Sequence, residues 1–167
     1  HAAGCLGIQK VREQPIQTMS INGLGTQLLL EKIAPSNSCK RFVYFSTSEV
    51  YGPNSLNVNE REACILPPDD IRWNYACSKL FGEFLTKSYA QQYQLPTVIV
   101  RPFNVYGPNR YSSYGLGTIL KRALANQPIY ISGNGKQCRS WCHVQDFTRS
   151  ITSSLTATEA VGHTFNI

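Results

Sequence analysis

This sequence of 167 residues has no long apolar run and no segment that resembles a secretory signal. A helix needs ~20 apolar residues to cross a bilayer, and no run in the sequence approaches that length. A secretory signal would open with a basic, then an apolar, then a small-residue pattern, which the first residues do not show. These absences predict a soluble, cytoplasmic protein without a membrane partner.

The sequence also lacks a concentrated basic patch, although it carries 16 basic residues against 10 acidic ones. Lysine and arginine are scattered, with at most two in a row, as in Lys40-Arg41 and Lys121-Arg122. Nucleic-acid binders gather such charges on one face, so we predict no nucleic-acid partner. The net charge of +6 instead suits an anionic small molecule such as a diphosphate.

A complete set of zinc ligands is missing as well. Of the six cysteines, Cys138 and Cys142 stand close to His143, but no second Cys or His pair supplies four ligands. We therefore predict no metal, and we expect His143 to be a satisfied buried residue. Without a secretory signal the compartment is expected to be reducing, so the cysteines are interpreted as free thiols.

What the sequence does contain is a regular alternation of elements in a chain whose length suits one domain. Its composition, 42% hydrophobic and 16% charged, is typical of a globular core. Apolar periodicity predicts helices over residues 16–33, 75–92, 118–126 and 144–155. Apolar and β-branched runs predict strands over residues 41–46, 96–100 and 164–167, and Gly-Asn-Gly predicts the turn of a hairpin over residues 130–142.

Strands that alternate with helices form a parallel sheet covered on both faces. We therefore predict an α/β fold that contains part of a doubly wound, Rossmann-like parallel sheet. The pentapeptide VYGPN occurs at residues 50–54 and again at 105–109, but the flanking segments do not match. Both copies follow a predicted strand, so they indicate two similar turns at the ligand-binding edge of the sheet rather than a repeat.

Side chains suited to acid–base chemistry stand next to these turns. Tyr75 and Lys79 are four residues apart, so they share one face of the predicted helix. A phenol has a pKa near ~10, and a neighbouring cation lowers it by stabilising the phenolate. The hydroxyl of Thr47, at the end of the first predicted strand, is positioned to share a substrate proton. Thr47, Tyr75 and Lys79 thus form a candidate catalytic set.

Several separated motifs accompany this set. They are His1-Ala2-Ala3-Gly4, Asn22-Gly23-Leu24-Gly25-Thr26, the segments 45–52 and 101–108, and Arg139-Ser140 with Val144 and Asp146. Together they resemble the extended short-chain dehydrogenase/reductase family, and specifically its NAD-dependent nucleotide-sugar epimerases and dehydratases. Ser140 stands where the family usually has Asp.

The resemblance implies a role for each matching residue. Tyr75 would be the base, Lys79 would hold the nicotinamide ribose, and Thr47 would orient the sugar hydroxyl. The implied contacts with NAD are made by Ala3, Ser46, Tyr75, Lys79 and Phe103. In the nucleotide-diphosphate sugar, Asn104 would face the substrate and Arg139 would meet the diphosphate.

Ser48 and Glu49 bear on the type of reaction. Family dehydratases typically have Asp-Glu here, and Ser48 cannot protonate a leaving hydroxyl as a carboxylic acid can. The expected activity is therefore 4-epimerisation through a transient keto sugar. The alternatives are a nucleotide-sugar decarboxylase, a dehydratase, or a non-catalytic remnant that serves in assembly.

The family's glycine-rich, phosphate-binding loop has no counterpart in this sequence. We expect the chain to be the middle of an enzyme, and the sequence leaves open whether it is active by itself or is an inactive fragment. Residues 1–108 would carry the end of the Rossmann-like domain, and residues 109–167 the start of a small substrate-binding region mixed with returning Rossmann elements.

Other residues have two interpretations. We expect Arg101 to form a structural ion pair, and Asn22 to serve either helix packing or scaffolding of the site. The family forms dimers through the helix that bears Tyr and Lys, so a homo-oligomer is expected. Phe81, Phe84 and Leu85 would form that interface or belong to the core.

Overall fold

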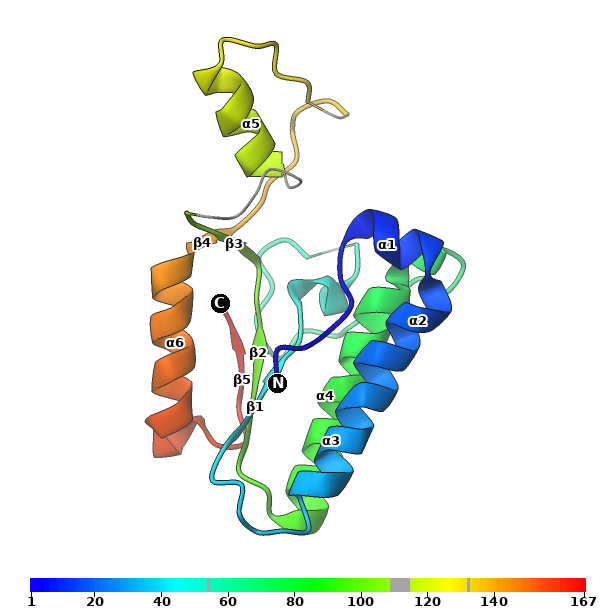
Figure 1. Ribbon diagram of the computed structural model, residues 1–167, viewed down its shortest axis with the longest axis vertical. Coiled ribbons are helices and arrows are strands. Elements are labelled where there is room, and N and C mark those ends of the chain that lie inside the picture. Colours follow the sequence, from blue (N-terminus) through cyan, green and yellow to red (C-terminus); the bar gives the residue numbers. More distant parts are fainter. Residues whose placement is uncertain (54, 109–114, 132) are drawn as a thin grey trace.

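The computed structural model describes residues 1–53, 55–108, 115–131 and 133–167. Its centre is a parallel sheet of β1 (Phe42–Phe45), β2 (Thr97–Arg101) and β5 (Thr164–Asn166), in the order β1-β2-β5 (Figure 1). All five residues of β2 are buried, as expected for a central strand of a sheet that is covered on both faces.

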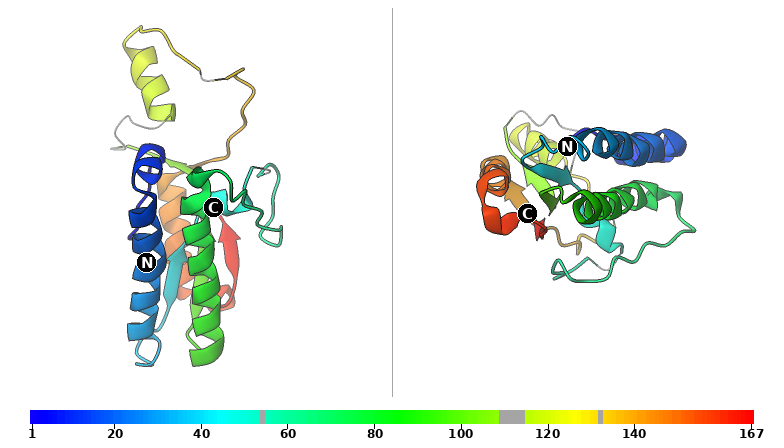
Figure 2. Two further views of the ribbon diagram at one scale, coloured as in Figure 1. Left: turned by 90° about the vertical axis from the view of Figure 1, so that its right-hand side faces the viewer. Right: turned by 90° about the horizontal axis from the view of Figure 1, so that it is seen from below.

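Helices cover both faces of this sheet (Figure 2). On one face, α2 (Pro15–Met19), a π-helical turn (Ser20–Leu24) and α3 (Gly25–Ile33) form one rod, and α4 (Asn74–Tyr93) lies beside it. On the other face lies α6 (Val144–Thr156).

The core divides in the same way, because successive side chains of a strand point to opposite faces. Phe42, Tyr44 and Ile99 pack with Leu30 of α3, whereas Val43, Val98, Val100 and Ala160 form the second cluster.

A second, two-stranded sheet stands beyond the carboxyl ends of the main strands (Figure 1). It consists of β3 (Asn104–Tyr106) and β4 (Trp141–His143), which pair in parallel. Beyond it lies α5 (Gly115–Leu124), in which no residue is buried. The remaining elements are α1 (Ile8–Glu13) and the 3-10 turns Ser48–Tyr51, Ile71–Trp73 and Thr158–Ala160.

The parallel α/β architecture predicted from the sequence is confirmed, and the long helices and the strands of the main sheet lie within a few residues of their predicted bounds. The predicted hairpin over residues 130–142 is wrong. Gly133 and Gly135 do adopt the positive φ angles of a tight turn. However, β4 begins only at Trp141 and pairs with β3, which lies far earlier in the sequence. The turn was therefore predicted correctly, but the strand that pairs with β4 was not. The short helix α1 was not predicted. In the described part of the chain, no helix combines the length and the apolar character that a membrane crossing requires.

Candidate functional site

One face of α4 carries a row of polar side chains against the sheet. Tyr75, Lys79 and Glu83 stand at positions i, i+4 and i+8, so they follow one another along the helix. Tyr75 is half-buried, while Lys79 and Glu83 are only 5% and 2% exposed. Charged residues are rarely buried without a partner, which makes this face the first candidate for a functional site.

The ammonium group of Lys79 lies at the end of β1. Its Nζ donates a hydrogen bond of 2.8 Å to the backbone oxygen of Phe45, and it lies 5.3 Å from the centre of the Tyr44 ring. Burial lowers the pKa of Lys79 to about 8, because removal from water disfavours the charged form. The side chain is therefore a cation that is held close to its titration point.

Thr47 follows directly, where the chain leaves β1. Its Oγ1 accepts a hydrogen bond from the Glu49 backbone N–H, which caps the 3-10 turn Ser48–Tyr51. The backbone N–H groups of Ser46 and Ser48 donate to the oxygens of Val100, in β2, and of Pro102, just after it, so the chain stays attached to the end of β2. Thr47 is thus fixed at the carboxyl edge of the sheet.

Ser48 and Glu49, the two residues that bear on the type of reaction, differ in exposure. Ser48 is half-buried and Glu49 is exposed. Desolvation of its carboxyl group nevertheless raises the pKa of Glu49, and Arg72 acts in the opposite direction.

The backbone around Gly4 also approaches the Lys79 ammonium group, and this segment is called the cradle below. The first residues run along the edge of β1, where the Phe45 N–H donates to the His1 oxygen. Asn22 then holds the next segment, because its Oδ1 accepts from the Cys5 N–H and its Nδ2 donates to the Cys5 oxygen and to Ser78 Oγ.

The glycine in this segment makes the close approach possible. A Cβ atom at Gly4 would lie 3.0 Å from Asn22 Oδ1 and 3.3 Å from Lys79 Nζ. Asn22 thus links α4 to the first segment of the chain, as its predicted packing role requires, and it holds the backbone beside Lys79. The bare backbone beside a buried cation fits a ligand rich in hydroxyl groups, such as the ribose of a dinucleotide.

The residues predicted to face the substrate gather around the second sheet instead. Asn104 Nδ2 donates to the Ser140 oxygen at 3.0 Å, and the neighbouring Arg139 is exposed and donates to the Cys138 oxygen. Phe103, predicted to contact the cofactor, is half-buried, and its N–H donates to the Ile167 oxygen. The structure thus brings Asn104 and Arg139 near each other, on a different element from Tyr75 and Lys79.

His143 is half-buried rather than fully buried. Its Nδ1 accepts from the Gln145 N–H and so caps α6, and its ring lies 5.2 Å from that of Tyr106. This is the satisfied residue that the sequence predicts. All six cysteines are free thiols, and among the residues that the structure describes no three His, Cys, Asp or Glu residues gather as a metal site would require.

The predicted ion pair of Arg101 is confirmed, and its partner is Glu83, at 2.6 Å between Arg101 Nη2 and Glu83 Oε2. Sequence reasoning did not identify Glu83. The available signal was an acidic residue one turn beyond Lys79, on a helix face that also carries buried small residues.

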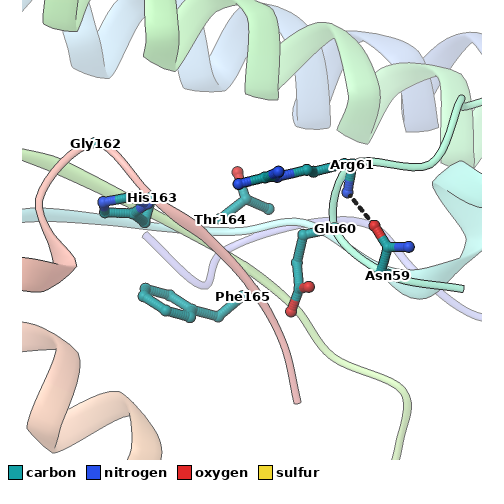
Figure 3. A pocket seen from close by; sticks show the side chains of 7 residues that line it. All are labelled: Asn59, Glu60, Arg61, Gly162, His163, Thr164 and Phe165. Atoms are coloured by element: carbon teal, nitrogen blue, oxygen red, sulfur yellow. Dashed lines mark hydrogen bonds between the residues drawn. The ribbon is translucent and has the colours of Figure 1, made fainter.

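An open hollow of about 780 Å³ lies elsewhere, between the segment Asn59, Glu60 and Arg61 and the segment 162–165 at the outer edge of β5 (Figure 3). Within the first of these segments the Arg61 backbone N–H donates to the Asn59 side chain (Figure 3). None of Thr47, Tyr75 and Lys79 lines this hollow. We therefore locate the candidate site by its chemistry, on the α4 face, rather than by the size of a hollow.

Comparison with known proteins agrees with this geometry. A sequence model described as the NAD dependent epimerase/dehydratase family matches residues 1–167. The chain belongs to this family.

Individual members of the family give a similar picture. The chain is 32% identical to a dTDP-D-glucose 4,6-dehydratase of Dictyostelium discoideum, with 100% of the chain and 40% of the relative covered. It is 33% identical to a UDP-N-acetyl-alpha-D-glucosaminuronate decarboxylase of Bacillus cytotoxicus, over 93% of the chain and 49% of the relative.

Among solved structures, a UDP-glucuronic acid 4-epimerase of Bacillus cereus, in complex with UDP-glucuronic acid and NAD, matches with a TM-score of 0.82 and 30% identity. That match covers 100% of the chain and 52% of the epimerase. The chain therefore spans about half the length of these family members or less.

Proposed function

We propose that the protein is an NAD-dependent nucleotide-sugar 4-epimerase that acts through a transient keto sugar. The observation that carries the proposal is the buried ammonium group of Lys79, one helical turn from Tyr75 and bonded to the strand end that precedes Thr47. A cation in this place favours the phenolate form of a neighbouring tyrosine, and so prepares it to take up a proton.

In this proposal each residue of the site has a separate role in proton transfer or in substrate binding. Tyr75 takes the proton from the sugar hydroxyl that is oxidised and later returns it. Thr47 orients that hydroxyl from the end of β1. Asn104 and Arg139, beside the second sheet, contact the sugar and the diphosphate, to which the planar guanidinium group of arginine is suited.

The cradle of Ala3 and Gly4 beside Lys79 is where the nicotinamide ribose would bind, with Ser46 and Phe103 as further contacts. NAD, when bound there, would supply a reversible hydride acceptor for the sugar carbon that is oxidised. Lys79 holds the ribose hydroxyls in place and keeps a positive charge next to Tyr75.

The type of reaction rests on Ser48. A dehydratase needs an acid that protonates a leaving hydroxyl, and the side chain of Ser48 carries no carboxyl group. The likeness to the UDP-glucuronic acid 4-epimerase supports this assignment, and the likeness to a decarboxylase gives the second candidate.

Incubation with UDP-glucuronic acid and NAD tests the proposal directly. We expect the 4-epimer of the substrate as the product, with no loss of carbon. Release of carbon dioxide would favour the decarboxylase, and a 4-keto-6-deoxy product from UDP-glucose would favour a dehydratase. Absence of turnover with any nucleotide sugar in a screen would favour the non-catalytic remnant.

We also propose a homodimer through the outer face of the rod α2–α3 and of α4. Large apolar side chains are exposed there: Ile16 82%, Leu28 61%, Phe81 43% and Phe84 66%. Leu85 instead packs against the core, which separates it from the two phenylalanines.

Apolar patches of this kind mark interaction surfaces. Light scattering of the Phe84→Asp variant should show a monomer, and an unchanged mass would contradict the dimer. The matched control is Leu124→Asp, because Leu124 of α5 is 86% exposed and lies on a different element.

A further inference from the structure

Glu83 does more than pair with Arg101. Its Oε1 accepts hydrogen bonds from Ser46 Oγ at 2.5 Å and from Arg101 Nε at 2.8 Å, while its Oε2 accepts from Arg101 Nη2 at 2.6 Å. All three residues are buried, at 2–4% exposure. One carboxylate of α4 therefore holds both the end of β1 and the end of β2.

Arg101 extends this network to two further segments. Its Nη1 donates to the Tyr51 hydroxyl at 2.8 Å, and that hydroxyl donates to Asn166 Oδ1 at 2.8 Å. Tyr51 belongs to the 3-10 turn that follows Thr47, and Asn166 ends β5. The carboxyl ends of all three strands of the main sheet thus meet on one buried ion pair.

The same helix face reaches β1 at two successive residues. Lys79 Nζ donates to the Phe45 oxygen, and one turn later Glu83 accepts from Ser46 Oγ. The next residue is Thr47. The position of Thr47 relative to α4 is consequently fixed by two hydrogen bonds to the helix that also carries Tyr75.

We propose that Glu83 is a positioning residue, which sets the distance between the Thr47 hydroxyl and the Tyr75 and Lys79 side chains through its bond to Ser46. The inference rests on the proposed function, because it assigns Glu83 to the site that would perform the reaction. A buried ion pair is often no more stabilising than apolar residues of the same volume. A fully satisfied polar network does, however, specify one geometry.

The first variant, Ser46→Ala, removes the link and leaves the ion pair intact. Hydrogen exchange of residues 47–51 should accelerate about tenfold, because the turn loses its anchor to α4. With UDP-glucuronic acid and NAD, kcat should fall about tenfold while KM changes less than about twofold, since misplaced reacting groups slow the chemical step. Ser46→Thr restores a hydroxyl and should recover most of both.

Thr86→Ala is the matched control. Thr86 is fully buried on α4 and donates to the Gly82 oxygen, so the variant also loses one buried hydroxyl, away from the site. It should leave the exchange of residues 47–51 and kcat unchanged. Equal exchange and equal kcat in Ser46→Ala and Thr86→Ala would overturn the proposal.

A second variant separates Glu83 from any direct contact of Ser46 with the cofactor. The double change Glu83→Met with Arg101→Met keeps Ser46 and an apolar core, and it should show the same faster exchange and lower kcat. Wild-type-like exchange and kcat in that folded double variant would also overturn the proposal. If the wild-type protein converts no nucleotide sugar, the proposed function fails, and the exchange comparison alone then decides the role of Glu83.

Discussion

Two buried cations, Lys79 and Arg101, lie at the carboxyl ends of the neighbouring strands β1 and β2, and their surroundings differ. Arg101 at the end of β2 meets the Glu83 carboxylate in two hydrogen bonds. Burial alone would lower the pKa of Arg101, but the hydrogen bonds and the charge of Glu83 outweigh it and raise that pKa. Lys79 at the end of β1 bonds a neutral carbonyl, and burial lowers its pKa to about 8.

The comparison distinguishes Arg101, a structural cation paired with a carboxylate, from Lys79, a buried cation that bonds only a neutral oxygen. A paired cation keeps its charge at every accessible pH, so Arg101 can hold strand ends together but cannot respond to a ligand. A cation that only burial perturbs keeps its charge at a cost in stability, and such groups cluster at functional sites.

The largest effect is expected when the ion pair of Arg101 and Glu83 is broken. Arg101→Met leaves the Glu83 carboxylate buried without a counter-charge, and stability should fall by about 3–5 kcal/mol. Urea unfolding followed by circular dichroism measures this loss. The double variant Glu83→Met with Arg101→Met should recover most of it, because both charges are gone. A double variant as unstable as the single one would show that the loss comes from packing rather than from the unpaired charge.

The next effect concerns activity rather than stability. Tyr75→Phe removes only the ionisable oxygen, so turnover of UDP-glucuronic acid should fall at least about a hundredfold, as expected for loss of a general base. Circular dichroism checks that the variant, which retains the half-buried ring, is folded. Near-normal turnover in this variant would exclude Tyr75 as the base.

The pair Tyr75 and Lys79 and the pair Arg101 and Glu83 also show which contacts the sequence can predict. Tyr75 and Lys79 could be proposed as a pair because their spacing is local, and the structure confirms that both lie on one helix, α4. The ion pair of Arg101 was expected, yet its partner was not, since Glu83 lies 18 residues away in sequence and is joined to Arg101 only by the packing of α4 on β2.

Long-range pairing also explains the wrong hairpin, because β4 pairs with β3 rather than with the residues before its own turn. Asn22 likewise reaches Ser78 across 56 residues, a partner that no local pattern indicates. In both cases tertiary packing selected the partner.

A smaller effect is expected where Gly82 of α4 packs against the Tyr44 ring, close to Lys79. A Cβ atom at Gly82 would lie 2.0 Å from the Tyr44 hydroxyl oxygen, and the Tyr44 ring is fully buried. Gly82→Ala should therefore cost about 1–3 kcal/mol through overpacking. Urea unfolding provides the value, and Gly115→Ala in α5 is the control, because a Cβ atom there meets nothing within 4 Å. Equal stability of the two variants would mean that α4 can shift away from Tyr44 without cost.

The smallest effect, and the most direct test of the comparison, comes from Lys79→Met. The pKa of Lys79 drops from 10.5 to about 8 on folding. The unfolded chain therefore binds more protons than the folded one between about pH 8 and 10.5, and wild-type stability should rise with pH across that window. Below about pH 8 the full penalty is present. At ~1.36 kcal/mol for each pKa unit it amounts to about 3 kcal/mol.

Methionine at this position removes the penalty but leaves the Phe45 oxygen without its donor, which costs about 1–3 kcal/mol. At pH 7 the variant should accordingly be more stable than the wild type by about 1 kcal/mol, although its activity is lost. Above about pH 10.5 Lys79 is neutral in both states, so the wild type should become the more stable of the two. Urea unfolding at pH 7, 8, 9, 10 and 11 measures this crossing.

Lys87→Met, which replaces an exposed lysine of the same helix, should show differences within about 0.5 kcal/mol throughout. A difference between Lys79→Met and the wild type that stays constant from pH 7 to 11 would mean that the Lys79 ammonium group is solvated, and the contrast with Arg101 would then rest on geometry alone.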